Sequence, residues 1–577
     1  MKKLFVHDMV QNNPGLEKYK SKYNMPVFLK QRGYDGKVFD LFECAQFAIE
    51  WKLLNAAHPE REPVFLANSR ELEWVKRKKQ ELKKEYLGMK ENGIQVFFMM
   101  DIIVLPNRLK KLYPEIMNEK GEIDILKPEM KEILYYLFAE MFDTFPEIDG
   151  VYIRYGETYV GEKYSTPYHC GNNPILYPET SYHLFLMEFL RDIICSKYGK
   201  SVFYRTWGFG KFQYDPDFYL TISNMLEPHP LFYFCIKHTQ GDFHRLFPFN
   251  QCLNKGNHHQ VVEVQAAREY EGKGAYPDYI AGGVINGFEE LNWIMRGNEK
   301  KCLTELFESE ESLIDGIWIW SRGGGWGGPY INKNIDEKGK TVAEKGCELW
   351  PDINSYVLSH WAKDMSRSDQ FYVMEYAKSV LDMHEKDAEK LYQILQLSAH
   401  AVLLGRGTTI QGIEWDVFWT RDQNISYDLI MKNIKSAENA GKLSLLVEEK
   451  ANSVKVWSQI VNISENISKK GYFTDYIITT CKYGYFLYAI YETIYRGNAK
   501  MLMGDKCAVK NALIEYDALW NEWENLYENS IGCPTLFAKE DKILDMGGYC
   551  TNTGLDGAMN PLRKFIDKKP YTRFADL

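Results

Sequence analysis

Short apolar runs alternate with helical patterns in the first part of this 577-residue chain, and this alternation limits its possible folds most strongly. The helical patterns, such as 69–93 and 127–142, place apolar residues three and four positions apart. The other runs are almost continuously apolar, as strands buried on both faces are. Eight runs are therefore predicted as strands: 27–33, 63–68, 94–101, 149–157, 200–207, 231–239, 259–267 and 314–321.

Eight strand–helix repeats within roughly 300 residues predict an α/β fold, the (β/α)8 or TIM barrel. A doubly wound sheet is the alternative, but it normally has fewer strands and needs no closure. After residue 350 the pattern changes to long amphipathic helices, as at 368–404 and 511–530. We therefore predict a barrel over residues 1–350 and a mainly α-helical C-terminal domain over 351–577.

The net charge of −9, without any basic block, argues against nucleic acid or an anionic membrane as a partner. The longest apolar stretches fall short of the ~20 residues that a membrane span needs. His7 and Asp8 interrupt the N-terminal apolar run, so we expect no signal peptide and a cytoplasmic location. The 11 cysteines form no CxxC pair, and neither a metal nor a cofactor is expected. The oligomeric state stays open, with a homodimer as one option.

Ionisable residues at the ends of the predicted strands are the first candidates for a functional site. In such barrels the chemistry takes place at the C-terminal ends of the strands, where the loops begin. Four consecutive predicted strands end in such residues. These are Arg154 and Glu157 in the fourth, Arg205 and Trp207 in the fifth, Lys237, His238 and Asp242 in and after the sixth, and Arg268 and Glu269 after the seventh.

Each of these residues also has a structural interpretation. Glu157 could cap the strand end or pair with a neighbouring arginine, Asp242 could be an ordinary turn residue, and Glu269 could begin a helix. Arg205 and Lys237 follow apolar strands, where an unpaired cation is unfavourable. These two cations therefore either pair with the acids or hold a ligand anion.

The aromatic and histidine candidates fit either packing or sugar binding. Trp207 and Trp320 could pack at the rim of the barrel or form a platform on which a sugar stacks. His238 has no carboxylate at metal-ligand spacing, so no metal site is expected there. The chain has no Gly-x-Ser-x-Gly elbow. This inventory indicates acid–base hydrolysis.

Several of these segments resemble a known family in their order and spacing. The segments "VFYRTW" around Arg205, "FCIKHTQGDF" around Lys237 and "VEVQAAREYEG" around Glu269 are similar to segments of glycoside hydrolase family 67 α-glucuronidases. Further similar segments, "QRGYDGKVF" and "LWPDINSYVLSHW", begin at residues 31 and 349. The resemblance implies an inverting enzyme that removes glucuronic acid from oligosaccharides in carbohydrate metabolism and polysaccharide degradation.

The resemblance also implies roles for individual residues. Glu157 would be the general acid, and Asp242 and Glu269 would activate water. Arg205 and Lys237 would bind the carboxylate of the sugar. Three carboxylates at one mouth are expected to raise one another's pKa. Arg154, Trp207, His238 and Trp320 complete the expected substrate-binding set.

The chain departs from this family at three places, one of which is the glycine- and tryptophan-rich end of the eighth predicted strand. Ile153 stands where the family has a lysine, and Arg154 follows one position later, on the opposite side of a regular strand. No β-sandwich domain is expected before the barrel, because the first strand is predicted at residue 27. A hydrolase of a neutral or another acidic sugar, and a carbohydrate-binding protein without catalysis, therefore remain alternatives.

Overall fold

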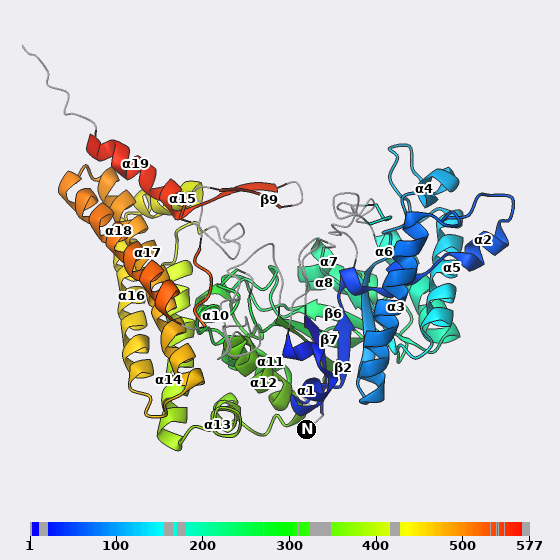
Figure 1. Ribbon diagram of the computed structural model, residues 1–577, viewed down its shortest axis with the longest axis horizontal. Helices are drawn as coiled ribbons and strands as arrows, with labels where there is room; N and C mark the ends of the chain where they lie inside the picture. The colour runs from blue at the N-terminus through cyan, green and yellow to red at the C-terminus, as the bar shows by residue number, and fades with distance from the viewer. Residues whose placement is uncertain are drawn as a thin grey trace, which may run out of the picture.

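The computed structural model contains a closed barrel with a helical region beside it (Figure 1). The residues that it describes are 3–10, 21–154, 166–169, 180–208, 210–268, 270–308, 311–322, 348–415, 427–530, 532–537, 539–540, 542–546 and 549–567.

Eight parallel strands form the barrel in chain order, and β8 closes the ring against β1. In this closure His7 of β1 pairs with Trp318 of β8. The predicted (β/α)8 barrel is therefore confirmed, and so is the mainly helical region that follows it. The strands are β1 Phe5–Val10, β2 Gly36–Phe39, β3 Gln95–Asp101, β4 Gly150–Arg154, β5 Ser201–Arg205, β6 Phe232–Lys237, β7 His259–Gln265 and β8 Ile314–Arg322.

Helices connect most successive strands on the outside of the barrel. Ser69 caps the longest of them by accepting a hydrogen bond from the N–H group of Leu72. Residues 238–258 between β6 and β7 are all described, and they contain no helix. The helices are α1 Pro26–Gln31, α2 Lys52–Ala57, α3 Arg70–Glu91, α4 Leu109–Leu112, α5 Pro128–Thr144, α6 Thr180–Leu190, α7 Lys211–Tyr214, α8 Pro216–Ser223, α9 Ile280–Asn286, α10 Leu291–Ile294 and α11 Leu303–Leu306.

The first two predicted strands are wrong. Residues 27–33 lie mostly in α1, which begins at Pro26, and proline is well suited to the first turn of a helix. Residues 63–68 form an irregular connection that ends at Asn68 in the left-handed conformation, with φ 61°. A short apolar run does not by itself distinguish a strand from a helix or a buried loop.

The first strand, β1, was concealed by two polar residues that interrupt its apolar pattern. Inside the barrel, the ring of His7 stacks on Phe97 with 4.4 Å between centroids and hydrogen-bonds to the hydroxyl of Tyr152. On the outer face, Asp8 forms a 2.5 Å ion pair with Lys37 of β2. Both polar side chains are thus accommodated by partners that lie on other strands.

The helical region begins with α12 Leu349–Lys363, which packs against β8, β1 and α9 in the usual place of the last barrel helix. The helix expected at 368–404 is divided in two at Val380–His384, where Asp382 has φ 53°. The domain boundary at residue 350 stays a prediction. The remaining elements are α13 Asp369–Ser379, α14 Glu385–Arg406, α15 Tyr427–Asn439, α16 Leu443–Glu465, α17 Tyr472–Leu502, α18 Lys506–Asn529, the antiparallel hairpin of β9 Lys542–Met546 and β10 Tyr549–Thr553, and α19 Leu555–Asp567.

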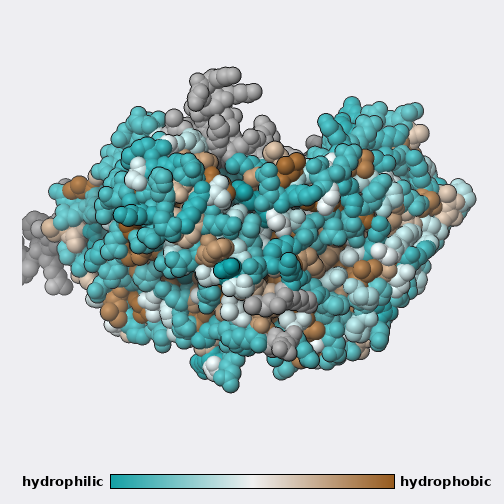
Figure 2. Space-filling model, turned by 90° about the horizontal axis from the view of Figure 1, so that it is seen from below, coloured by the Kyte–Doolittle hydropathy of each residue, from teal (hydrophilic) through white to brown (hydrophobic). Residues whose placement is uncertain are grey.

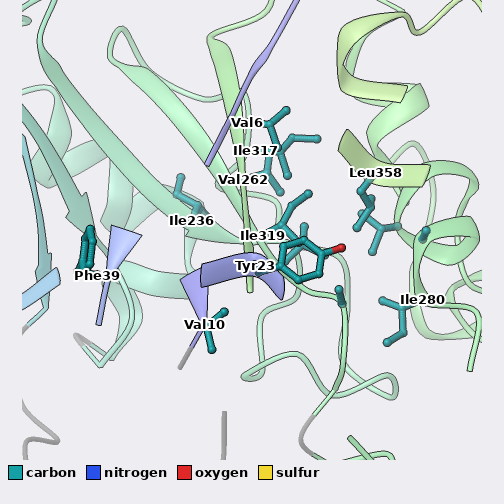
Figure 3. Packing of buried hydrophobic residues seen from close by; sticks show 14 of the residues in the cluster. Val6, Val10, Tyr23, Phe39, Ile236, Val262, Ile280, Ile317, Ile319 and Leu358 are labelled. Atoms are coloured by element: carbon teal, nitrogen blue, oxygen red, sulfur yellow. The ribbon is translucent and has the colours of Figure 1, made fainter. Parts of the chain in front are cut away.

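Two separate hydrophobic clusters lie on the two sides of the barrel wall, because alternate residues of a strand point in opposite directions. Figure 3 shows part of the outer cluster, in which Ile317 and Ile319 of β8 lie near Leu358 of α12. The inner cluster fills the barrel with the side chains of Met9, Val38, Leu41, Phe97, Met99, Tyr152, Phe203, Cys235, Phe243, Val261, Trp318 and Trp320.

The surface seen from below the view of Figure 1 is mainly hydrophilic, with hydrophobic residues scattered over it (Figure 2). Within the described ranges, none of the helices is long and apolar enough to cross a membrane.

Candidate active site

The inward-facing rows of several strands carry charged side chains at or near their ends, at the mouth of the barrel. The mouth, where the strands end, faces the upper side of Figure 1, the side on which the β9–β10 hairpin also lies. All of these side chains are buried, and they come from five consecutive strands. They are Asp101 of β3, Arg154 of β4, Arg205 of β5, Lys237 of β6 and Glu263 of β7.

Asp101 and Arg154 form a bidentate ion pair between neighbouring strands. The Nε and Nη2 atoms of Arg154 donate to the two carboxylate oxygens of Asp101 at 2.7 and 2.9 Å. Ile153 packs in the outer cluster, so Arg154 points inward. Sequence analysis did not single out Asp101, although it ends the predicted strand 94–101 and the strand-end criterion applies to it.

Arg205 forms a second bidentate pair, with Glu263 of β7, two strands further round the barrel. Its Nη2 and Nε atoms donate to Glu263 at 2.6 and 3.0 Å, and neither residue is exposed to solvent. The guanidinium also lies 5.2 and 5.4 Å from the ring centroids of Trp318 and Trp320. Of the two interpretations of Arg205, pairing with an acid is therefore the one observed, and the acid is one that sequence analysis missed.

Asp242 is presented to the mouth by a strained turn after β6. Its φ is 41° and that of Phe243 is 68°, values that residues other than glycine rarely adopt. The preceding Gly241 is required there, because a Cβ would lie 2.4 Å from the ring of Phe247. Backbone of this kind persists where the surrounding structure fixes it, and it is often found at functional sites.

Two side chains hold the carboxylate of Asp242. The ammonium of Lys237 pairs with one oxygen, and the hydroxyl of Tyr270 donates to the other. Burial alone would raise the pKa of Asp242, but Lys237 and the hydrogen bond from Tyr270 outweigh it and lower the pKa below its usual value. Asp242 is therefore ionised at neutral pH. The expectation that three carboxylates raise one another's pKa stays a prediction, because Glu157 and Glu269 lie outside the described residues.

His238 lies behind the mouth, in a hydrogen-bonded chain that supports the loop after β7. Its Nε2 atom accepts from Nη2 of Arg268 at 3.2 Å, so its proton is on Nδ1, which donates to the carbonyl of Glu263. Burial and then Arg268 lower the pKa of His238 well below its usual value, so the ring is neutral. Arg268 in turn forms a 3.1 Å ion pair with Glu271.

The two tryptophans expected to bind substrate lie at different depths. Trp207 is only half-buried, and the centroid of its ring lies 3.6 Å from the ammonium nitrogen of Lys237. Trp320 is 7% exposed and belongs to the inner cluster, where it contacts Trp318 and Phe243 with centroids 5.6 Å apart in each case. Trp207 is therefore the ring more open to a ligand at the rim.

Two of the three carboxylates expected to be catalytic, Glu157 and Glu269, lie outside the described residues. Asp242 is the one that the structure places at the mouth. In the part of the chain that the structure describes, no group of three His, Cys, Asp or Glu side chains is arranged to hold a metal ion. The described site therefore offers an ionised carboxylate that can accept a proton, beside cations and an aromatic rim.

The chain is similar to solved structures in its fold, but comparisons of its sequence with known proteins found no match. No protein-family model matches the chain, and no curated protein matches it. Among solved structures, the chain is similar to a glycoside hydrolase family 138 enzyme that targets pectin rhamnogalacturonan II, with 11% identity and a TM-score of 0.50. This match covers 97% of the chain but only 66% of the other protein, so the chain spans just under two thirds of that enzyme.

Two further matches are weaker. A mutant of the Thermobaculum terrenum O-GlcNAc hydrolase matches at 10% identity and a TM-score of 0.39, over 98% of this chain and 94% of the other. A family 20 exo-β-N-acetylglucosaminidase from Vibrio harveyi matches at 12% identity and a TM-score of 0.34, over 66% of this chain and 58% of the other. At these identities the comparisons show the barrel fold alone, and the resemblance to family 67 stays a prediction.

Proposed function

We propose that this protein is a glycoside hydrolase that releases a terminal α-linked uronic acid, similar to glucuronic acid, from an oligosaccharide. The observation that carries the proposal is Asp242, an ionised carboxylate held at the mouth of a (β/α)8 barrel by Lys237 and Tyr270. A carbohydrate substrate is also supported by the likeness of fold to an enzyme that targets pectin rhamnogalacturonan II.

In the proposed reaction, Glu157 donates a proton to the glycosidic oxygen, which leaves the anomeric carbon with the electron pair of the broken bond. Asp242 or Glu269 accepts a proton from a water molecule, and the water oxygen bonds to the anomeric carbon from the opposite face. The released sugar therefore has the inverted configuration. The roles of Glu157 and Glu269 rest on the sequence resemblance.

An acidic sugar is proposed because two cations at the mouth lie over the same ring. The guanidinium of Arg205 and the ammonium of Lys237 lie 5.4 and 5.9 Å from the centroid of Trp320. A uronate carboxylate that reaches them would gain charge-assisted hydrogen bonds, which are stronger than neutral ones. The half-buried ring of Trp207, beside Lys237, would then contact the sugar.

A neutral sugar is the second candidate, and a specific observation favours it. The three cations expected to bind substrate each have a carboxylate partner already: Arg154 has Asp101, Arg205 has Glu263 and Lys237 has Asp242. A buried cation that is already paired gains less from a ligand anion than an unpaired one does.

A panel of aryl glycosides and oligosaccharides tests both candidates. The proposal predicts release from α-linked uronides at a higher kcat/KM than from the matching neutral glycosides. Proton NMR during early turnover should show the inverted anomer first. Preference for a neutral glycoside would select the second candidate, retention would exclude the mechanism, and no release from any member would indicate a binding protein.

A further inference from the structure

Two buried carboxyl groups, those of Glu271 and Asp278, face each other in the loop between β7 and α9. Glu271 is 7% and Asp278 5% exposed, and a side-chain hydrogen bond joins them. Neither oxygen of Asp278 accepts a hydrogen bond from any donor in the described part of the chain. Two carboxylate ions have no hydrogen to donate, so they cannot hydrogen-bond to each other. One of the two groups therefore carries a proton.

The neighbouring arginines decide which of the two groups is ionised. The Nη1 atom of Arg268 lies 3.1 and 3.4 Å from the two oxygens of Glu271. Burial alone would raise the pKa of Glu271, but Arg268 and then Arg245 outweigh it and lower this pKa. Burial, and then the charge of Glu271, raises the pKa of Asp278 well above its usual value. Asp278 therefore keeps the proton and donates it in the hydrogen bond to Glu271.

Charged and titratable groups approach this pair from several elements. They are His244 and Arg245 after β6, Arg268 and Tyr276 after β7, Glu290 before α10 and Arg406 in α14. Arg245 already donates two hydrogen bonds to Glu290, each at 2.8 Å, and Arg406 interacts with Glu271. A negative charge on Asp278 would therefore be buried without a donor, which is unfavourable.

The backbone between the two carboxyl groups forms a strained turn. Residues 272–274 have φ values of 89°, 50° and 78°. Such backbone persists where the surrounding structure fixes it. The hydrogen bond between Asp278 and Glu271 joins the two ends of this turn, and the amide of Asn354 in α12 donates to the backbone carbonyl of Asp278 at 2.9 Å. The turn is thus anchored to α12 at one end and closed by the carboxyl pair.

This turn begins beside the residues that connect the loop to the mouth of the barrel. Tyr270 directly precedes Glu271, and its hydroxyl donates to Asp242. Arg268, which pairs with Glu271, also donates to His238 at 3.2 Å behind the mouth. The position of Glu271 therefore affects both connections.

We infer that Asp278 is a positioning residue, which as a neutral carboxylic acid donates a hydrogen bond to Glu271 and thereby holds Tyr270 against Asp242. Asp278 acts through these residues and touches no substrate. Its effect on turnover rests on the proposed glycosidase function, whereas the shared proton is a property of the fold.

The first test measures the shared proton and needs no substrate. Above about pH 4 an unfolded Asp278 releases its proton, whereas the folded protein keeps it, so wild type loses stability as the pH rises. Asp278→Asn still donates to Glu271 but has no proton to take up. In urea titrations, the folding equilibrium constant of this variant relative to wild type should rise by up to about tenfold per pH unit from about pH 5 upward.

Asp369→Asn is the matched control for the first test. Asp369 is also a buried carboxylate, but it accepts hydrogen bonds from Tyr279 and Asn286 at 2.7 and 2.9 Å. The amide is a poorer acceptor, so this variant should be less stable than wild type, without a gain that grows with pH. If the relative stability of Asp278→Asn does not change with pH, then Asp278 carries no shared proton and the inference is overturned.

The second test measures positioning with the substrate that the panel identifies. Asp278→Leu keeps much of the shape of the side chain but removes the donor, and it should lower kcat/KM about tenfold or more. The acidic limb of its kcat/KM profile should also move to higher pH, because Tyr270 no longer stabilises the charge of Asp242. Asp278→Asn should keep the wild-type limb and a kcat/KM within about threefold of wild type. Asp278→Ala replaces the leucine variant if leucine disturbs folding.

The outcomes separate the inference from the proposed function. If the folded leucine and asparagine variants have the same kcat/KM and the same acidic limb, Asp278 does not position Tyr270, and the glycosidase function stands. If wild type cleaves no member of the panel, the proposed function fails and the positioning role fails with it. In that case the urea titrations still decide whether Glu271 and Asp278 share a proton.

Discussion

Two ion pairs at the mouth of the barrel use similar side chains but differ in the backbone that presents them. Arg205 and Glu263 both lie on regular strands, and their side chains are 1% and 0% exposed. Lys237 also ends a strand, but its partner Asp242 lies in left-handed backbone, and that carboxylate side chain is 11% exposed. Sheet geometry is therefore enough to fix the cation Arg205, whereas presenting the anion Asp242 requires a strained turn.

The largest expected effect follows from neutralising the anion that the strained turn presents. Asp242→Asn should lower kcat/KM by about 10³-fold or more, because the amide cannot accept the proton from water. Asparagine tolerates the left-handed conformation, so the turn should persist. Steady-state kinetics and near-ultraviolet circular dichroism check both points. Activity within tenfold of wild type would show that Asp242 is not the base.

Breaking the Arg205–Glu263 pair should mainly lower the stability of the fold. Glu263→Gln leaves the buried Arg205 without a counter-charge and should lower the free energy of unfolding by about 3 to 5 kcal/mol. Urea denaturation measures this change. The double variant Arg205→Met with Glu263→Gln should recover part of the loss, because no unpaired charge remains. If Glu263→Gln lowers the free energy of unfolding by less than about 1 kcal/mol, then water or another group already stabilises the charge of Arg205.

Replacing the cation itself tests whether Arg205 has a role beyond the barrel. Under the uronide proposal, Arg205→Met should reduce kcat/KM for a uronide roughly 30- to 1000-fold, which corresponds to a loss of about 2 to 4 kcal/mol of transition-state stabilisation. The kcat/KM for the matching neutral glycoside should fall much less. Unfolding curves must first show that the variant is folded at the assay temperature. An equal loss on both substrates would assign Arg205 to the fold and favour the neutral sugar.

The smallest expected effect concerns the second group that holds Asp242. Tyr270→Phe removes a hydrogen bond to the ionised carboxylate and should lower kcat/KM by about 3- to 10-fold. The bond favours the charged form, so its loss raises the pKa of Asp242. A base is active only when deprotonated, and the acidic limb of the kcat/KM profile should therefore move to higher pH.

Tyr276→Phe is the matched control for this pH experiment. Its hydroxyl is also buried, but it hydrogen-bonds to Tyr488 at 3.0 Å and not to Asp242. The acidic limb should stay where it is in wild type. If the acidic limb shifts in both variants, or in neither, then the hydrogen bond from Tyr270 does not set the pKa of Asp242.

The same contrast shows how much of the site the sequence predicts. Strand ends are visible as apolar runs that stop at a charge, and this criterion finds Arg154, Arg205 and Lys237. It also applies to Asp101, which was overlooked. Glu263 is different, because it lies inside a strand and joins the mouth only through an arginine 58 residues away in the chain.

The parts that sequence analysis did not predict depend on contacts between distant residues. β1 was missed because His7 and Asp8 look unsuitable for a buried strand until Phe97 and Lys37 are placed beside them. The left-handed φ of Asp242 was not foreseen either, since aspartate gives no signal comparable to glycine. Six of the eight strands, by contrast, have local patterns strong enough to be recognised without their partners.

The pairing of β1 with β8 has a consequence for the synthesis of the chain. His7 and Trp318 are neighbours in the finished barrel, yet roughly 300 residues separate them. At 5 to 20 residues per second, a ribosome needs about 15 to 60 s to make that length. During this time one edge of β1 has no strand to pair with, and exposed strand edges promote aggregation. We therefore expect heterologous production to improve with slow growth at low temperature or with added chaperones.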